Sequence, residues 1–159
     1  MAHPNQDLIN KFYNSFSQKN PNGMVECYSD AIEFQDPVFG LISGSKPRAM
    51  WQMLLERSTS LQVSFSNILA DDTNGSADWV AEYEFSKTKR KVVNRIHAEF
   101  TFKDGKIITH KDTFSLWKWA GMALGTKGYL LGFTPLVQNK IKSEAISGLE
   151  LYMKRKRIT

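Results

Sequence analysis

The sequence has little that could hold the protein together covalently or carry it across a membrane. Its 159 residues include one cysteine, Cys27, which excludes an intramolecular disulfide and a cysteine-based metal site. No stretch reaches the roughly 18 uninterrupted apolar residues of a membrane-spanning helix. The closest, 116–137, is broken by Lys118, Lys127 and four glycines. The N-terminus is polar and lacks the apolar core of a secretion signal, so we expect a cytoplasmic protein.

Net charge is also scarce outside the C-terminus. The chain has 21 Lys and Arg against 16 Asp and Glu, a formal charge of +5, and the run Lys154 to Arg157 supplies four of these, which leaves 5 − 4 = +1. Because a nucleic-acid surface needs basic residues clustered on one face, we expect no nucleic-acid partner. The basic run is either the solvated end of a helix, where it complements the helix dipole, or a contact for an acidic partner or a membrane.

Motifs for cofactors and activated nucleophiles are missing. The sequence contains neither the phosphate-binding Gly-x-Gly-x-x-Gly nor the Gly-x-Ser-x-Gly nucleophile elbow. His97 and His110 are predicted to point to opposite faces of the sheet, so they cannot share a metal. We therefore predict neither a metal nor an organic cofactor.

Hydrophobic periodicity is plentiful, and it predicts helices first and strands later. Helices are predicted over 7–18, from Asn20-Pro21 through Tyr28, from Ser45, over 115–124 and from Thr134. Strands are predicted over 32–36, 61–69, 77–85, 92–102 and 108–114. Loops are predicted over 39–45 and in the glycine-rich connector 125–132. The order predicts an α+β fold in which helices pack on one face of a curved, mostly antiparallel sheet. We expect one domain, 1–159, with 117–159 as a helical C-terminal extension.

A few polar residues interrupt the apolar face of these strands and are the candidate functional residues. They are Asp36, Asn67, Asn94, His110 and Asp112, with Tyr83 able to offer a hydroxyl. Burying such groups costs free energy unless they are paired or solvated. Several on one face therefore indicate a cavity or an internal hydrogen-bond network.

Three of these residues are candidates for acid–base chemistry. His110 and Asp112 lie two apart on one strand and point the same way, as a cavity-facing acid–base pair or as a structural hydrogen-bonding pair. Asp36 precedes Pro37 at a strand end, where it either accepts hydrogen bonds from nearby turn amides or sits as a carboxylate at the mouth of a cavity. A carboxylate in an apolar pocket has a raised pKa and can transfer protons.

Aromatic and amide side chains on the same face are candidates for binding a ligand. The set is Tyr13, Phe16, Phe34, Trp51, Asn67, Trp79, Tyr83, Asn94 and Phe114. The aromatic members are equally suited to a packed core. Trp117 and Trp119, which begin the glycine-rich segment, belong either to the core or to a movable lid or partner contact.

The order of motifs resembles that of the nuclear transport factor 2-like superfamily, and more closely its SnoaL-like branch, which includes polyketide cyclases. The resemblance covers about Leu8 to Leu116. It rests on Ile32-Glu33-Phe34-Gln35-Asp36-Pro37, on Gly44 before a helix, and on Asp104-Gly105-Lys106-Ile107 leading into His110-x-Asp112-x-Phe114.

The resemblance implies a cystatin-like cone, in which a strongly curved sheet wraps around the N-terminal helices and encloses an apolar pocket. It also implies a homodimer through the outer sheet face and acid–base chemistry without cofactors. His110 and Asp112 would be the acid–base element, and Asp36 lies near the position of an isomerase-type base. The Asp/Arg/Asp arrangement of limonene epoxide hydrolase is not matched, because Arg95 is predicted to point outward.

Two functions follow as alternatives. The first is a small isomerase, cyclase or related lyase or hydrolase acting on a small hydrophobic carbonyl-type or cyclic molecule. The second is a non-catalytic module of the same fold that binds a small ligand or associates with a protein.

Overall fold

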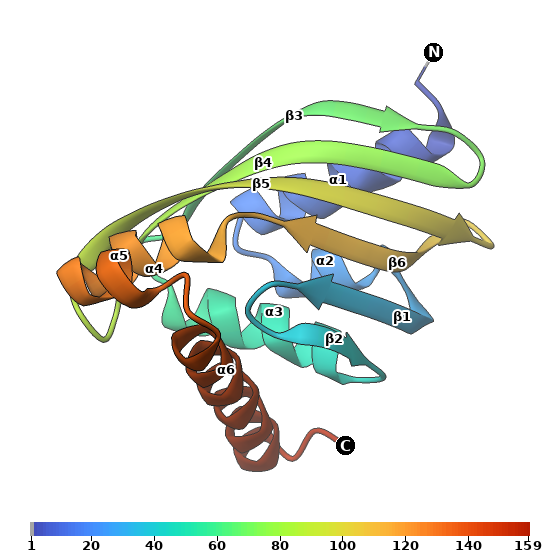
Figure 1. Cartoon of the computed structure of the whole chain (residues 1–159). Coiled ribbons are helices and arrows are strands. Elements are labelled where there is room, and N and C mark those ends of the chain that lie inside the picture. The colour runs from blue at the N-terminus through green and yellow to red at the C-terminus, as the bar shows by residue number, and fades with distance from the viewer. Residues whose placement is uncertain (1) are drawn as a thin grey trace.

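The computed structural model describes residues 2–159 (Figure 1). The order of elements is that of an α+β fold, in which helices and runs of consecutive strands are segregated, and the C-terminal part is helical. The helices are α1 (Pro4–Ser17), α2 (Pro21–Val25), α3 (Lys46–Arg57), α4 (Leu116–Leu124), α5 (Thr126–Leu131) and α6 (Pro135–Lys156). The strands are β1 (Tyr28–Asp36), β2 (Gly40–Ser43), β3 (Gln62–Ala70), β4 (Asn74–Phe85), β5 (Arg90–Lys103) and β6 (Lys106–Thr113).

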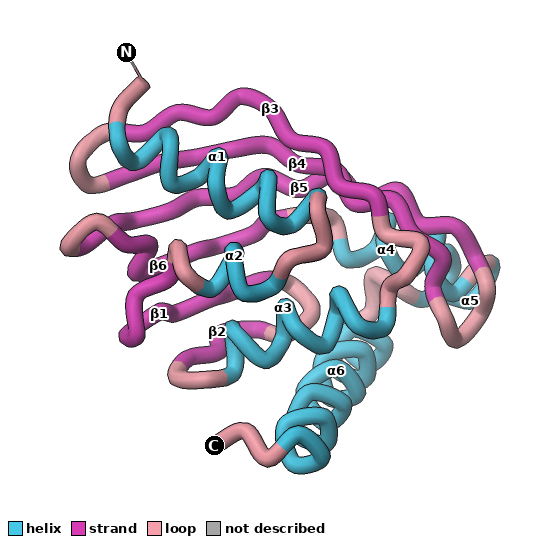
Figure 2. The backbone as a smooth tube through the Cα atoms, turned by 180° about the vertical axis from the view of Figure 1, so that it is seen from behind, coloured by secondary structure: helices cyan, strands magenta, loops and turns pink. Residues whose placement is uncertain are grey.

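The strands form one six-stranded sheet in the order β2-β1-β6-β5-β4-β3. β1 and β6 run parallel, and the other neighbouring pairs are antiparallel. The helices α1, α2 and α3 cover one face of this sheet (Figure 2). The parallel pair places Phe34 beside His110, so the last residues of β1 and β6 lie next to each other. The predicted α+β class is confirmed, and the cone shape stays a prediction.

The core fills the space between the sheet and these helices. In β5 the side chains at Val92, Asn94, Ile96, Ala98 and Phe100 are buried, and those between them at Arg95, His97 and Glu99 are exposed. This strict alternation is the period-two pattern that the sequence predicts for a sheet with one covered face. The buried side then meets an unusually aromatic helix layer that includes Phe12 and Trp51.

Two segments predicted as loops are regular structure. The segment 40–43 forms β2 and pairs with β1, with Phe34 opposite Ile42; four residues are too few to show a period. The segment 126–131 forms α5, because Gly128 and Gly132 lie directly against Ala120 of α4. Glycine lowers helix propensity, so the sequence favours a connector there, and close packing outweighs that preference.

The C-terminal helices extend from the end of β6. α4 packs on β5, α5 packs on α4, and α6 contacts α3. The basic run lies in the last turn of α6, where Lys156 is 3.5 Å from Glu56. Within residues 2–159, no helix is both long and apolar enough to cross a membrane.

Candidate active site

The predicted pair on β6 is hydrogen-bonded and buried. His110 Nε2 lies 2.9 Å from Asp112 Oδ1, and the two residues are 1% and 3% exposed. Both point toward the helices, as expected for residues two apart on a strand. A titratable pair this deep must be fully matched with donors and acceptors, because an unpaired buried charge is costly.

Two further residues extend the pair into a continuous chain. Tyr28 Oη is 2.8 Å from His110 Nδ1, and Trp51 Nε1 donates to Tyr28 Oη at 2.9 Å. Indole is a donor only, so all groups are matched when Trp51 donates to Tyr28, Tyr28 to His110 Nδ1, and His110 Nε2–H to Asp112. Burial raises the pKa of Tyr28 well above its usual value, which keeps this hydroxyl a donor.

Asp112 is held from a second side but keeps one oxygen open. Trp79 Nε1 also donates to Oδ1, at 3.2 Å. Among residues 2–159, no donor forms a hydrogen bond with Oδ2. The carboxyl group is therefore fixed in orientation and still able to accept a hydrogen bond or a proton from another molecule.

An aromatic shell surrounds the His110 ring. The ring centroids of Phe100, Phe34 and Phe12 lie 4.5, 5.0 and 5.4 Å from it, and Trp51 stacks on it at 6.2 Å. Such a shell excludes water and strengthens the electrostatic interactions inside it.

Asp36 lies beside Asp112 at the end of the parallel strand pair. Gln35 is paired with Lys111, so Asp36 and Asp112, the next residues along the two strands, are neighbours about 5 Å apart at the backbone. Asp36 Oδ1 accepts hydrogen bonds from Val38 N (2.9 Å) and Phe39 N (2.6 Å), which confirms the predicted turn.

The environment nevertheless makes Asp36 hard to ionise. Burial, together with the nearby Asp112 charge, raises the pKa of its carboxyl to about 7 despite the lowering effect of the two amides. A half-buried carboxyl with a pKa near neutrality can take up and release protons at physiological pH.

Polar groups on β4 and β5 border this corner. Tyr83 is half-buried, and its Oη accepts a hydrogen bond from Trp119 Nε1 at 2.7 Å. Burial raises the pKa of Tyr83, and the Asp36 charge contributes. Asn94 is only 8% exposed, and no hydrogen bond joins its amide to another side chain or to the backbone within residues 2–159.

The predicted ligand-binding residues divide by position. Those in the aromatic core are Tyr13, Phe16, Phe34, Trp51 and Trp79. Phe114 is half-buried next to Tyr83 and the N-terminal part of α4. Tyr13 Oη is buried without a hydrogen-bond partner, so one donor in the core is unused. Of the two candidate core tryptophans, Trp119 is buried and Trp117 is 39% exposed.

The predicted inward orientation of Asn67 is wrong. The pairing of β3 with β4 shifts between Ser66 and Leu69, because a β-bulge inserts one extra residue. Asn67 takes a left-handed conformation with φ 55° and donates to Asp78 Oδ2 on the exposed face. A one-residue insertion reverses the faces of all following residues, so Leu69 is also exposed, at 64%.

Tyr28 is the functional candidate that the sequence pattern did not reveal. The pattern extends the second predicted helix through Tyr28, whereas this residue begins β1. Its partner His110 lies 82 positions later in the chain, and a local period carries no information about such a pairing. The sequence offered one weak signal, which is that Tyr28 lies shortly before the segment 32–36, a predicted strand.

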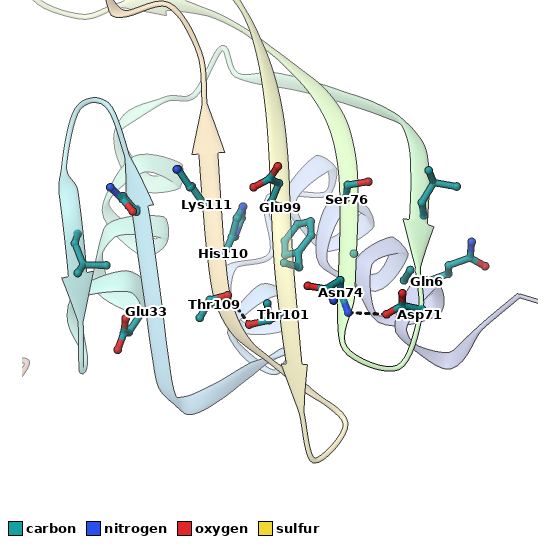
Figure 3. A pocket seen from close by; sticks show the side chains of 16 residues that line it. Gln6, Glu33, Asp71, Asn74, Ser76, Glu99, Thr101, Thr109, His110 and Lys111 are labelled. Carbon is teal, nitrogen blue, oxygen red and sulfur yellow. Dashed lines mark hydrogen bonds between the residues drawn. The ribbon is translucent and has the colours of Figure 1, made fainter.

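The opposite face of the sheet carries a separate groove. It has a volume of about 810 Å³ and is bordered by Glu33, Glu99 and Lys111 (Figure 3). Its lining also includes Leu41 of β2 and Leu69 of β3, the two edge strands. His110 contributes to its floor, but the His110 side chain is buried toward the helices. Within residues 2–159, no three His, Cys, Asp or Glu side chains form a group that could hold a metal ion.

Comparisons with known proteins agree with this architecture. The model of the SnoaL-like domain family matches residues 9–110, whereas a comparison with curated proteins finds no match. An LEH-like epoxide hydrolase of M. tuberculosis is 18% identical, with a TM-score of 0.63 over 84% of this chain and 95% of its own. A candidate polyketide cyclase from Xanthomonas campestris is also 18% identical, with a TM-score of 0.61 over 75% of this chain and 96% of its own.

A third similar structure has a bound small molecule. It is a protein with a ketosteroid isomerase-like fold from Catenulispora acidiphila in complex with trimethylamine, 11% identical, with a TM-score of 0.60 over 74% of this chain and 92% of its own. At these identities the structures show a shared fold only. The family model covers more than half of the chain, and the protein therefore belongs to the SnoaL-like family, with a nuclear transport factor 2-like fold.

Proposed function

We propose that this protein is a cofactor-independent acid–base enzyme acting on a small hydrophobic carbonyl-type or cyclic substrate, as an isomerase, cyclase or related lyase or hydrolase. The observation that carries the proposal is the carboxyl pair Asp36 and Asp112, in which Asp36 has a pKa of about 7. Neighbouring carboxyl groups with different environments are how one site holds an acid and a base together.

In the proposed reaction Asp36 is the mobile base. Its carboxylate takes a proton from the carbon beside the substrate carbonyl, and the electron pair of that C–H bond moves to the carbonyl oxygen as an enolate. When the substrate carries a C=C bond next to this carbon, the anion is a dienolate, and protonated Asp36 returns the proton to the far carbon of that bond. The double bond thereby moves into conjugation with the carbonyl, and the isomerisation needs no other reactant. A pKa near 7 suits both transfers at neutral pH.

The remaining groups would orient and stabilise the enolate. Tyr83 accepts its hydrogen bond from Trp119, so its own O–H is free to donate to the enolate oxygen. The amide of Asn94 is a second donor on the same face. Asp112, fixed by His110 and Trp79, is the second acid–base residue and maintains the raised pKa of Asp36.

The test is deuterium uptake from D2O at the carbon beside the carbonyl of a panel of apolar cyclic ketones, followed by NMR. We expect Asp36→Asn to lower the rate by roughly 10²- to 10⁴-fold, the range for removal of a general base. Asp112→Asn should also abolish turnover while the protein stays folded. The matched control is Asp78→Asn on the exposed face, which should behave as wild type. Uptake that is equal in wild type and Asp36→Asn would refute the assignment.

A non-catalytic ligand-binding or association module is the second candidate. It is favoured by the dense aromatic packing around His110 and by the complete hydrogen bonding of the Trp51–Tyr28–His110 chain. This alternative predicts that an apolar ketone binds equally to wild type and Asp36→Asn, measured by calorimetry, with no deuterium uptake in either.

The family resemblance also suggests a homodimer through the outer sheet face. The groove supports this proposal, because Leu41 and Leu69 on that face are 63% and 64% exposed. Burying these side chains against a second copy would remove apolar area from water.

A further inference from the structure

A second apolar surface lies far along the chain from the sheet groove. The large hydrophobic side chains exposed among residues 2–159 number nine, and six of them fall within 20 consecutive positions. These six form what we call the C-terminal patch: Trp117, Tyr129, Leu130, Leu131, Phe133 and Leu136. They belong to α4, α5, the turn after α5 and the start of α6, which lie together at one edge of the molecule (Figure 1).

α5 buries its small residues and exposes its large apolar ones, which is the reverse of the usual arrangement in a helix. Gly128 and Gly132 are buried against Ala120 of α4, whereas Tyr129 and Leu130 are 63% and 59% exposed. A Cβ atom on Gly128 would come within 2.0 Å of the Ala120 carbonyl oxygen. The helix therefore turns its smallest residues inward and its largest apolar residues outward. Monomeric proteins rarely expose a contiguous apolar surface without using it.

The segments that carry and adjoin the patch are mostly basic, and Glu144, the first acidic residue after it, lies 3.5 Å from Lys87. From 113 to 143 the sequence contains four lysines and no Asp or Glu. The β4–β5 turn, 86–91, adds four basic residues and no acidic one. This turn is fastened to the end of α4, because Thr88 Oγ1 donates to Ala123 O and Arg90 Nε donates to Met122 O at 2.9 Å. Two segments far apart in the sequence thus bring basic residues to α4, the helix that carries part of the patch.

We propose that the C-terminal patch binds the surface of an anionic lipid membrane. Exposed Trp, Tyr, Phe and Leu side chains would enter the boundary between headgroups and acyl chains, while lysine and arginine contact the lipid phosphates. Each basic residue near an anionic surface adds to the attraction, so the two features act together. A second copy of the chain fits this surface less well, because it would bring two mostly basic surfaces into contact.

The test uses the full chain with two kinds of vesicle, pure phosphatidylcholine and phosphatidylcholine with 30% phosphatidylglycerol, at low salt. Binding is measured by co-sedimentation and by the emission of Trp117, whose exposure makes it the natural reporter; Trp117→Phe removes this signal. We expect binding to the anionic vesicles at least tenfold stronger than to the neutral ones.

Two variants separate the apolar and the charged contributions. Leu130→Ser with Phe133→Ser should weaken binding at least tenfold, and Lys89→Glu with Lys127→Glu should remove the preference for anionic vesicles. The matched control is Leu151→Ser, which removes an exposed leucine of α6 outside both the C-terminal patch and the outer sheet face and should bind as wild type. Circular dichroism checks that each variant is folded.

Three results would contradict the proposed membrane binding. Absence of binding to either vesicle would overturn the proposal. So would self-association in sedimentation that is lost in Leu130→Ser with Phe133→Ser, since a second copy would then be the occupant. Binding that the control weakens as much as the patch variant would also overturn it.

Discussion

The substitution Asp36→Asn offers a direct test of the raised pKa, independent of any substrate. In the wild type the pKa of Asp36 is about 7 in the folded state, against an ordinary value of 3.8. Between these values the folded protein binds a proton that the unfolded chain has released, so the free energy of unfolding falls as the pH rises through this window. Asparagine does not titrate, and its carbonyl oxygen can still accept the hydrogen bonds of Val38 N and Phe39 N.

The magnitude follows from the size of the shift. A change of about 3 units at roughly 1.36 kcal/mol each corresponds to about 4 kcal/mol. Because the side chain is only half-buried, water screens part of this, and we expect Asp36→Asn to be about 2 to 4 kcal/mol more stable than wild type at pH 8. At pH 4 Asp36 is neutral in the folded protein and partly ionised in the unfolded chain, and the difference should shrink to less than about 1 kcal/mol.

The measurement is urea unfolding of both proteins, followed by tryptophan fluorescence from pH 4 to pH 8.5. All other titrating groups are shared, so the difference between the two curves isolates position 36. The control Asp78→Asn should show the opposite sign, because the hydrogen bond from His97 lowers the pKa of Asp78, so its contribution to stability is lost on acidification. A difference between wild type and Asp36→Asn that stays constant from pH 4 to pH 8.5 would refute the reasoning.

Two further substitutions test the interior and the outer face. Tyr28→Phe leaves Trp51 Nε1 and His110 Nδ1 buried without partners, so urea unfolding should show a loss of about 2 to 4 kcal/mol, whereas Tyr13→Phe, which removes a hydroxyl without a partner, should cost nothing or stabilise. If the outer sheet face forms a dimer, Arg95→Glu should weaken it in sedimentation equilibrium; an unchanged dimer would exclude that face, and Leu130→Ser with Phe133→Ser serves as the control on the other surface.

The faces of the long central strands could be predicted from the sequence because each residue there has regular neighbours on both sides. In β5 the period of two holds without interruption, and it correctly sends Asn94 inward and Arg95 outward. The same rule fails in β3, because the bulge at Asn67 changes the count by one. The local signal for that bulge is weak: asparagine tolerates a left-handed conformation better than most residues, but nothing in the pattern required it.

Predicting the whole site requires knowing which strands are neighbours in the sheet, and a local sequence pattern does not contain this information. His110 and Asp112 are two apart, so their shared direction is a local property. Asp36 and Tyr28 reach them only through the parallel pairing of β1 with β6, across more than 70 residues of intervening chain. A parallel pair cannot be connected by a tight turn, so no hairpin signal announces it.

The turn role predicted for Asp36 is confirmed, and the proposed acid–base role is compatible with it. The turn amides of Val38 and Phe39 fix Oδ1, which is the local role that the Asp-Pro sequence indicates. The same fixation prevents the side chain from turning away toward water, so the carboxyl stays in the apolar corner beside Asp112. Two hydrogen bonds alone would lower its pKa, yet the pKa is raised, so burial and the neighbouring carboxylate outweigh them. The turn thus creates the condition for proton transfer, because it holds a carboxyl group where ionisation is unfavourable.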